Sequence, residues 1–414
     1  MSEKKFEVTV MRKYNAAVVG GCAAGMTAAI NAKRLNPELN IVIIEKLPRI
    51  GKKILATGNG RCNMTNLSAV ASDYKNADFV EKVFEKYPPE KVVDFFESTG
   101  LLTYADSESR VYPRSNMAAS VLDSLRFEIE GLGIDVICDM PVSEITKKNG
   151  GFEINREILC EKLIIATGGK SSPSQGSDGS GYSLAKQLGH SVTKLYPSLV
   201  PLTVKENVKP LKGVRARNVE LTLKTDREIK KTKGELLFTD GGISGIAAME
   251  LAAAAEELLE RVKQKTFTSI DFLPDMNLTQ LIDYMLKLKD IKGYCSIDML
   301  FSGILPKSLG IEICKACSLY KQEKKIARLN RREIINLAEK AKSFELEITG
   351  TKGFANAQVT SGGVSIEEIN PETMESVICK GLYFAGEIID VDAPCGGYNL
   401  QWAFASGLLA GENI

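Results

Sequence analysis

Histidine is almost missing from this sequence, and so is net charge. One histidine, His190, stands among 414 residues, and 53 basic side chains nearly balance 52 acidic ones. Without a basic excess, the composition argues against nucleic acid as a partner and disfavours an enzyme that modifies RNA. Because His190 follows Gly189 at the end of a predicted helix, we expect its ring to satisfy helix carbonyls rather than to take part in chemistry.

The chain also lacks long hydrophobic runs. No stretch approaches the ~18–20 apolar residues of a membrane span, and the amino-terminal segment lacks the apolar core of a signal peptide. The nine cysteines, an odd number, are therefore expected to be reduced thiols in the cytoplasm, with no membrane partner. Cys314 and Cys317 have Cys-x-x-Cys spacing, but no second pair and no nearby histidine accompany them, so we predict no metal site.

What the sequence does contain is a glycine-rich turn between an apolar run, residues 16–19, and a segment typical of a helix packed on a sheet. The turn residues are Gly20, Gly21, Cys22, Ala23 and Gly25. Free amide groups in such a turn, together with the positive end of the helix dipole, bind anions. A second apolar run ends at Glu45, twenty residues after Gly25, and Lys46 follows it. An acidic residue at this spacing accepts hydrogen bonds from a ribose 2′-hydroxyl, so the pattern predicts a dinucleotide site.

One position departs from the G-x-G-x-x-G pattern. Gly20 and Gly25 fit it, but Cys22 stands where the middle glycine is usual. That glycine normally lets the backbone approach a pyrophosphate. Either the Cβ of Cys22 points away from the ligand, or Gly21 takes over the close approach.

A second glycine-bearing loop contains Gly58, Gly60, Arg61 and Cys62. It has two interpretations, which the sequence leaves equally open. The loop is either a surface segment of turn residues or a second clamp on a cofactor. In the second case the Arg61 guanidinium would pair with phosphate or lie against a ring.

Glycines also follow two later apolar strands and precede the last helix. The residues concerned are Thr167, Gly168, Gly169, Gly386, Glu387 and Gly397. A helix start at Gly397 offers amide donors that stabilise negative charge, for example at the N1/O2 edge of a flavin. Because the chain has one such dinucleotide-binding turn, it either binds a diffusible nicotinamide transiently or holds a permanently bound dinucleotide. Widely spaced glycine loops favour extended FAD.

Periodicity divides the remainder into recognisable stretches. Helices are expected over 78–98, broken at Pro88-Pro89, and over 116–131, and a small antiparallel meander over 134–160. The fold class is α/β: a Rossmann-like FAD-binding domain with an inserted β-barrel-like domain and a helical subdomain. The expected boundaries are 12–190 plus 350–414 for the FAD domain, 191–245 plus about 343–349 for the β-rich insertion, and 246–342 for the helices.

Several longer motifs together resemble a known family. They are Gly58 to Asn63 with Thr65-Asn66, Thr239 to Gly245, Gln358 to Gly363 and Gly386 to Gln401. The chain resembles the bacterial BaiN-type flavoproteins, also described as NAD(P)/FAD-dependent oxidoreductases and aminoacetone oxidase-like FAD enzymes, from about residue 13 onward. The family fold has an FAD domain, a barrel-like insertion and a helical domain.

This resemblance assigns roles to individual residues. It implies that Gly20, Gly21, Gly25 and Glu45, with Cys22, Ala23 and Lys46 beside them, hold the ADP half of FAD. It implies that Gly60, Arg61 and Cys62, near Gly58, lie along the pyrophosphate and ring, that Thr167 to Gly169 pass near the adenosine, and that Val142 joins this cofactor-binding set. It places Gly386, Glu387, Asp392, Gly397, Tyr398, Asn399 and Leu400 along the ribityl chain and the pyrimidine edge.

Two further departures from the family pattern concern the active-site module. Asp240 stands where histidine is expected, and Ile246 replaces a proline, so a copied substrate specificity does not follow. With His190 set aside, candidate proton donors are Tyr112, Tyr398 and Cys395.

The function expected is hydride transfer between flavin N5 and a small organic substrate. NAD(P)H-linked reduction of an enone, with NAD(P)H docking transiently, is the first hypothesis. The second is oxygen-dependent oxidation of a small amine or aminoketone with release of hydrogen peroxide. A non-catalytic FAD-binding regulatory protein is a third, from another functional class. The sequence leaves the oligomeric state open.

Overall fold

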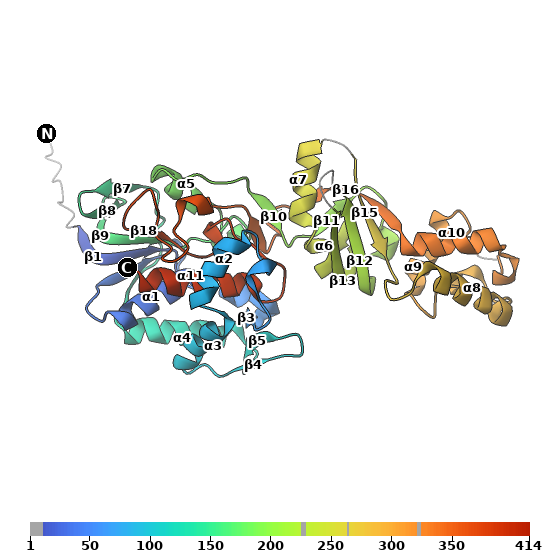
Figure 1. The fold of residues 1–414 in the computed structure, drawn as a ribbon, viewed down its shortest axis with the longest axis horizontal. Coiled ribbons are helices and arrows are strands. Elements are labelled where there is room, and N and C mark those ends of the chain that lie inside the picture. Colours follow the sequence, from blue (N-terminus) through green and yellow to red (C-terminus); the bar gives the residue numbers. More distant parts are fainter. Residues whose placement is uncertain (1–10, 225–228, 263–264, 321–323) are drawn as a thin grey trace, which may run out of the picture. The chain divides into compact units, whose positions relative to one another are not determined.

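The computed structural model describes residues 11–224, 229–262, 265–320 and 324–414. The chain forms two compact units, which we describe separately (Figure 1). The first unit comprises the chain up to Leu195 together with Val359–Ile414, and the second comprises Tyr196–Gln358. The division expected from sequence placed these breaks at 190/191 and 349/350.

A mostly parallel sheet of seven strands organises the first unit, in the order β6-β2-β1-β9-β8-β7, with β18 also paired to β9. Its strands are β1 (Arg12–Val19), β2 (Ile41–Ile44), β6 (Asp135–Ile137), β7 (Ile145–Lys148), β8 (Gly151–Ile154), β9 (Ile158–Ile165) and β18 (Leu382–Phe384). β1 lies between β2 and β9 and runs parallel to both. All four residues of β2 are buried, as expected for a strand covered on both faces.

The sequence predicted an antiparallel meander of three segments, 134–138, 142–147 and 151–160. The second and the start of the third pair as expected, as β7 and β8, but 151–160 divides into β8 and the beginning of β9, which pair with each other. The prediction was wrong for the first segment. β6 pairs in parallel with β2, with Ile43 opposite Val136. The reason is the connection: helix α4 (Ala118–Gly131) precedes β6 and carries the chain across the sheet face, so β6 enters the sheet in the same direction as β2.

Helices cover this sheet, and two of them pack unusually closely. The helices that cover the sheet are α1 (Ala23–Leu35), α2 (Ala77–Lys86), α3 (Pro89–Ser98), α4, α5 (Ser180–Gln187) and α11 (Tyr398–Glu412). A Cβ added at Gly407 of α11 would lie 2.5 Å from the Ala24 carbonyl oxygen, and one at Gly411 would lie 2.2 Å from that of Ala28. The two glycines therefore let the backbones of α11 and α1 approach each other.

Short elements complete the first unit. The strands are β3 (Thr65–Asn66), β4 (Thr103–Ala105), β5 (Arg110–Pro113) and β17 (Val359–Ser361), and the 3-10 turns are η1 (Ile54–Gly60), η2 (Ala71–Asp73), η3 (Pro173–Gln175), η7 (Ile366–Glu368) and η8 (Gly386–Ile388). β3, β5 and β4 form a separate small sheet.

His190 is buried at the end of α5, but its ring does not bind the helix carbonyls as expected. The backbone N–H of His190 donates to the Ala185 carbonyl, whereas Nε2 lies 2.8 Å from the Ser376 hydroxyl. Burial lowers the pKa of the imidazole. The ring thus packs as a neutral group against Phe384.

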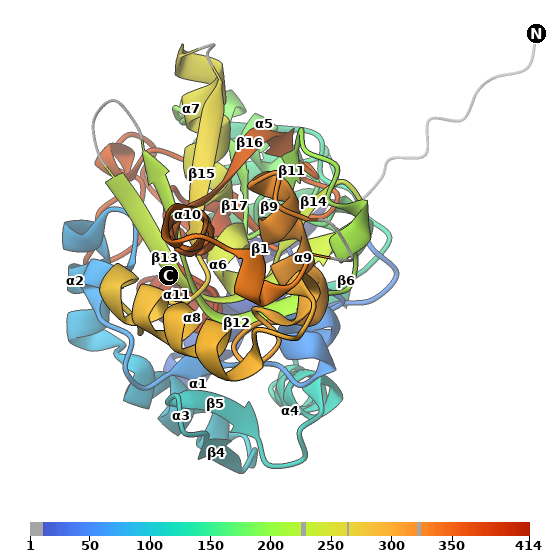
Figure 2. The same ribbon diagram turned by 90° about the vertical axis from the view of Figure 1, so that its right-hand side faces the viewer.

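The second unit is built on a closed antiparallel barrel in the order β11-β14-β13-β12-β15-β16 (Figure 2). Its strands are β11 (Leu202–Val204), β12 (Arg215–Lys224), β13 (Ile229–Thr239), β14 (Gly242–Ser244), β15 (Thr266–Asp271) and β16 (Phe344–Thr351); β10 (Tyr196–Ser198) precedes them. The expected β-barrel-like insertion is confirmed. However, the barrel draws β15 from the stretch 246–342, which the prediction gave to the helical part.

Helices follow and interrupt the barrel strands. They are α6 (Ile246–Met249), α7 (Ala252–Val262), α8 (Leu278–Lys292), α9 (Lys307–Ala316) and α10 (Arg331–Lys342), with 3-10 turns η4 (Lys209–Leu211), η5 (Ile297–Met299) and η6 (Ile326–Arg328). Their apolar faces share one hydrophobic core with the barrel, distinct from the core of the first unit. All nine cysteines are free thiols, and Cys314 is buried in α9. Within the described parts of the chain, no helix has both the length and the apolar character to cross a bilayer.

Candidate functional site

The first glycine turn joins β1 to α1 and leaves no room for side chains. Gly20 has a φ of +108°, and a Cβ there would lie 2.4 Å from the Ala166 carbonyl oxygen. A Cβ at Gly25 would lie 1.9 Å from the carbonyl oxygen of Gly20. Both positions therefore require glycine, and α1 begins directly behind the turn at Ala23.

The local geometry explains how Cys22 fits in this turn. Cys22 is the N-cap of α1 with φ −123°, a region open to any residue. Gly21, in contrast, would bring a Cβ within 2.5 Å of the Ile50 side chain. Cys22 is thus accommodated without strain, and Gly21 is required for packing against Ile50.

Glu45 and Lys46 follow β2 and lie at the same turn. The buried carboxylate of Glu45 accepts hydrogen bonds from the N–H groups of Gly21 and Leu47, both at 2.9 Å. Lys46 Nζ lies 2.5 Å from an Asp178 oxygen. Burial alone would raise the pKa of Asp178, but hydrogen bonds from Lys46 and Ser180 lower it to about 2.

Val142, which the family resemblance adds to the cofactor-binding residues, is an apolar residue close to this turn. It lies two residues beyond Met140, whose N–H donates to the Glu45 carbonyl. Its side chain is half-buried against the core of the first unit.

The second glycine loop adopts an unusual backbone. Gly58, Asn59, Gly60 and Cys62 all have φ between +55° and +81°. The guanidinium of Arg61 lies 4.6 Å from the ring centroid of Tyr112. Burial raises the pKa of the Cys62 thiol to about 12, so this sulfur stays protonated at neutral pH.

This loop and the segment after it pack against the start of α11. Thr65 donates to the Gln401 side chain at 2.7 Å, and Asn66 donates to the Gly396 carbonyl at 3.1 Å. A Cβ at Gly397 would lie 2.7 Å from the Thr65 carbonyl oxygen and 2.8 Å from Asn63 Oδ1. The structure therefore brings together two glycine segments that are more than three hundred residues apart in the sequence.

The residues predicted around Gly397 have distinct places. Tyr398 is the first residue of α11, and its carbonyl accepts a hydrogen bond from the Tyr74 hydroxyl at 2.9 Å. Asn399 bonds to the backbone of Ala393 through both its side-chain oxygen and its nitrogen. Cys395 and Leu400 are both half-buried on either side of the Gly397 turn.

A third group connects the ends of β9 and β18. Lys53 Nζ lies 2.7 Å from Glu387, and the other oxygen of Glu387 accepts the Thr360 N–H at 2.9 Å. A Cβ at Gly169 would lie 2.5 Å from the Thr360 hydroxyl. Asp392 accepts a hydrogen bond from Ser361 at 2.9 Å. The predicted segments Thr167 to Gly169 and Gly386 to Glu387 thus meet here.

Three residues were not singled out from the sequence: Lys53 and Thr360, which belong to this third group, and Asn63, which lies beside Gly397. Lys53 sits in a glycine–lysine–lysine run, and Thr360 precedes Ser361 and a glycine pair, so the polar loops could have indicated them. Two buried polar atoms in these groups have no hydrogen-bond partner: Asn63 Oδ1 and Thr167 Oγ1.

Tyr112 is the predicted proton donor with the most informative surroundings. Its ring is 3% exposed, on strand β5. Burial raises the pKa of its hydroxyl, against the opposing effect of Arg110 and Arg61. β5 pairs with β3, with Val111 opposite Thr65, and this register holds Tyr112 near the second glycine loop.

Two departures from the family pattern, Asp240 and Ile246, lie in the second unit. Asp240 forms an exposed ion pair with Lys212 at 3.5 Å. Ile246 is 42% exposed at the start of α6.

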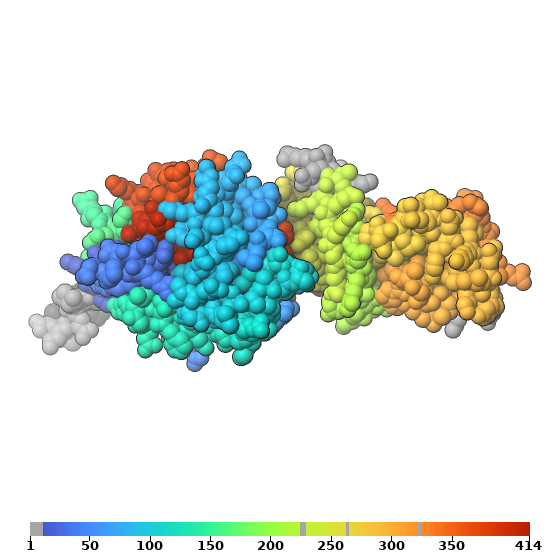
Figure 3. All heavy atoms as spheres, turned by 60° about the horizontal axis from the view of Figure 1, so that its bottom comes forward, coloured from blue at the N-terminus to red at the C-terminus, as the bar shows by residue number. Residues whose placement is uncertain are grey.

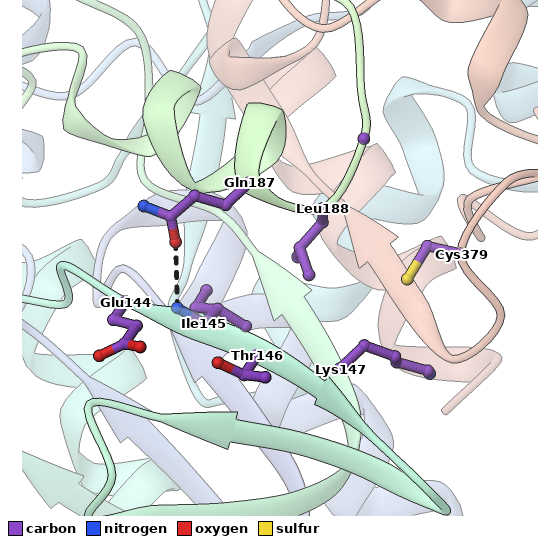
Figure 4. Close-up of a pocket in the computed structure, with 8 residues that line it drawn as sticks. Glu144, Ile145, Thr146, Lys147, Gln187, Leu188 and Cys379 are labelled. Atoms are coloured by element: carbon purple, nitrogen blue, oxygen red, sulfur yellow. Dashed lines mark hydrogen bonds between the residues drawn. The ribbon is translucent and has the colours of Figure 1, made fainter.

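An open cavity of ≈ 650 Å³ lies at β7 and the end of α5 (Figure 4). Its lining contains none of the residues of the glycine-rich groups described above. It is lined by Glu144, Ile145, Thr146, Lys147, Gln187, Leu188, Gly189 and Cys379. The Ile145 N–H donates to the Gln187 side chain at 3.1 Å across one side of it. None of these lining residues was predicted as a site residue.

Comparison with known proteins identifies the family. The sequence matches the HI0933-like protein Rossmann domain over residues 14–413. The chain belongs to this family. The BaiN-type resemblance and the Rossmann fold are thereby confirmed, and so is the expected class, an oxidoreductase.

Three relatives match over almost their whole length. The chain is 38% identical to the 3-dehydro-bile acid delta(4,6)-reductase of Clostridium scindens, covering 95% of this chain and 97% of the relative. It is 30% identical to the ribosomal RNA dihydrouridine synthase of Haemophilus influenzae, covering 96% and 97%. The enzyme of that name in Escherichia coli is 28% identical, with 98% of both chains covered.

Among solved structures, the 3-ketosteroid delta1-dehydrogenase of Sterolibacterium denitrificans is similar in fold. The TM-score is 0.51 at 12% identity, covering 97% of this chain and 99% of that one. At such identity the likeness concerns the fold alone.

Proposed function

We propose that the protein is an FAD-dependent reductase that saturates a carbon–carbon double bond conjugated to a carbonyl group, with NAD(P)H as electron donor. The observation that carries this proposal is the chemistry common to the relatives' names. One name specifies delta-4,6 double bonds in a 3-dehydro bile acid, where the carbonyl is conjugated with them. The other specifies dihydrouridine, which is uridine with its ring double bond, next to a carbonyl, reduced.

The residues of the first unit fit FAD. Asn63 Oδ1 and Thr167 Oγ1 are buried without a partner, and leaving such an atom unsatisfied costs roughly 1–3 kcal/mol. Asn63 Oδ1 lies beside the Gly397 turn, where a bound cofactor would satisfy it. The Gly20 turn and Glu45 would hold the adenosine half, and the Gly397 turn with Asn63 the other end. Bound FAD supplies hydride transfer.

The chain's own groups then orient the substrate and hold the proton. The start of α11 presents amide donors and the positive end of a helix dipole, which stabilise developing negative charge. A tyrosine hydroxyl is protonated at neutral pH, and burial raises the pKa of Tyr112 further, so this hydroxyl has a proton to give to the substrate carbon. Tyr398 and Cys395 remain alternative donors at the Gly397 turn.

The experiment is an absorption spectrum of purified protein followed by anaerobic titration with NADPH and NADH. We expect a flavin spectrum that bleaches, and that returns when a 3-keto-4-ene steroid or another small enone is added. A product heavier by two hydrogens, measured by mass spectrometry, completes the test. Protein that stays colourless after FAD is added would contradict the proposal.

The same titration separates the other hypotheses. Rapid bleaching by aminoacetone and hydrogen peroxide release in air would favour the oxidase. A bound flavin that no donor reduces would favour the regulatory protein.

A uracil ring in RNA is a second candidate substrate. Two relatives, 30% and 28% identical over nearly the whole chain, are named for it. The test replaces the enone by a uracil-containing RNA and measures dihydrouridine after nuclease digestion.

A further inference from the structure

The near-zero net charge of the chain conceals an unequal distribution between the two units. Residues 196–358 contain 27 lysines and arginines against 21 acidic residues, whereas the rest of the chain has 26 against 31. The excess is concentrated within residues 287–332, with eleven basic and four acidic side chains. The argument from overall charge against RNA therefore does not apply to the second unit.

Two chain segments in the helical part lie side by side. Ser296 and Lys325 form an antiparallel bridge, and the Ala327 N–H donates to the Gly293 carbonyl at 3.0 Å. Lys289 Nζ, from α8, donates to the Leu329 carbonyl at 2.6 Å. The end of α8 is thus fixed against η6 and the start of α10. Figure 3 shows that the gold and orange atoms of this helical part form one continuous surface.

Six exposed residues on these segments make up what we call the basic–aromatic surface: Lys292, Tyr294, Lys325, Arg328, Arg331 and Arg332. Tyr294 is 69% exposed, and Lys292 Nζ lies 5.7 Å from its ring centroid. Lys292 Nζ lies 3.2 Å from its hydroxyl. Among the described residues, no acidic side chain forms an ion pair with any of the five basic members.

Nearby cations that serve the fold are, in contrast, paired. Lys324 binds Glu333 at 2.7 Å, and Lys307 binds Asp298 at 2.8 Å. Arg331 and Arg332 also stand in the first turn of α10, where positive charge opposes the helix dipole. An anion bound at this surface would remove that unfavourable interaction.

We propose that the basic–aromatic surface docks RNA, with its cations on the phosphates and Tyr294 stacked on an unpaired base. Clustered lysine and arginine with an exposed ring is the combination that binds single-stranded nucleic acid. A membrane surface would require a broader apolar face beside the charges. The proposal rests on the second substrate class given above, and it concerns binding, which is measured without turnover.

The experiment compares full-length variants for binding of a fluorescein-labelled RNA of about 20 unstructured nucleotides, a length that exceeds one typical site. The test variant carries Lys325→Gln, Arg328→Gln and Arg331→Gln. The matched control carries Lys209→Gln, Arg217→Gln and Lys230→Gln, three exposed cations of the barrel unit. Anisotropy is measured between about 50 and 200 mM KCl to obtain the salt dependence.

We expect the test variant to bind RNA at least 10-fold more weakly and to lose about two from the slope of log K against log salt, as three lost phosphate contacts predict. Flavin bleaching by NAD(P)H should be unchanged. Tyr294→Ala in the native chain should also weaken RNA binding, because it removes the ring on which a base stacks. Tyr294→Phe should bind RNA like the native chain, because the phenyl ring still stacks.

Three outcomes would overturn the proposal: equal affinity of the test variant and the native chain, an equal loss in the control variant, or binding to phosphatidylglycerol vesicles but not to RNA. Since binding needs no flavin reduction, a failure of the proposed chemistry leaves this result interpretable. Conversely, RNA binding lost with enone reduction retained would uphold the docking surface alone.

Discussion

At the scale of single residues, the glycines of the candidate site differ in what surrounds them. Gly20 and Gly25 are enclosed by backbone, so an added Cβ would collide with the protein itself. Gly60 has a φ of +81° but no protein atom within 4 Å of an added Cβ. A glycine that faces open space in a polar loop is suited to close approach by a ligand.

The proposed contact of Gly60 with a ligand is tested by comparing alanine at Gly60 with alanine at Gly100, another glycine of the first unit. Gly100 matches Gly60, with a φ of +82° and no atom near an added Cβ, but lies outside the site. Gly60→Ala and Gly100→Ala should each cost about 1–2 kcal/mol of unfolding free energy for the left-handed backbone. Only Gly60→Ala should weaken FAD, measured by fluorescence titration of the apoprotein. Equal FAD affinity of both variants would contradict the placement of Gly60 beside the cofactor.

Tyr112→Phe is the corresponding test of the proton donor. Loss of a general acid lowers the rate of enone reduction by about 10²–10⁴-fold, while the rate of flavin bleaching by NAD(P)H should not change. Because burial raises the pKa of Tyr112 above its usual 10.0, the native enzyme should show no loss from deprotonation of this group below pH 10.

The pH profile of the oxidative half-reaction checks this assignment. A decline centred well below pH 10 that persists in Tyr112→Phe would assign the proton to another group. Tyr398→Phe and Cys395→Ser, made in parallel, identify that group among the remaining candidates.

At the scale of elements, the site depends on contacts that join distant loops. Lys53, in the loop after β2, pairs with Glu387 of η8, and both side chains are about one-fifth exposed, at 22% and 20%. Removing one partner leaves the other charge in a partly desolvated place.

Lys53→Met should therefore lower the unfolding free energy by roughly 1–3 kcal/mol, less than for a fully buried pair because solvent still screens the site. Lys82→Met is the control, since Lys82 and Glu85 form an exposed pair within one helix. That change should leave the free energy of unfolding nearly unchanged, because water screens the exposed pair. Urea unfolding of both variants gives the values. Similar losses in the two would show that the Lys53 pair has no special role.

The elements that sequence could predict are those with local signals. The apolar runs at β1 and β2, the glycines between β1 and α1, and the break at Pro88-Pro89 all follow from neighbouring residues. What sequence could not supply was pairing across long separations. The parallel direction of β6 depends on its crossover helix, and β15 becomes a barrel strand only through β12 and β16.

The same limit applies to the site. Gly20, Glu45 and Gly397 stand out by spacing, because a turn, a strand end and a helix start each have a composition of their own. Asn63 and Thr360 lie within motifs that carry the family resemblance, but spacing gives them no role, since that role comes from Gly397 and from Gly169, which approach them only in the folded chain.

At the scale of the whole molecule, the two units have separate hydrophobic cores, and all predicted cofactor-binding residues belong to the first. The only tryptophan, Trp402, is also in the first unit, in α11, and is 2% exposed. Its fluorescence therefore reports the unfolding of one unit, whereas far-ultraviolet circular dichroism reports both.

This arrangement predicts that FAD stabilises the first unit selectively. A ligand at about 100 times its Kd adds about 2.7 kcal/mol to the state that binds it, which raises Tm by roughly 5–11 °C for a unit of this size. On heating with and without FAD, the tryptophan midpoint should rise by that amount. The circular dichroism curve should separate into one transition that shifts and one that does not. Coincident midpoints in both signals, moving together, would show that the two cores unfold as one cooperative body.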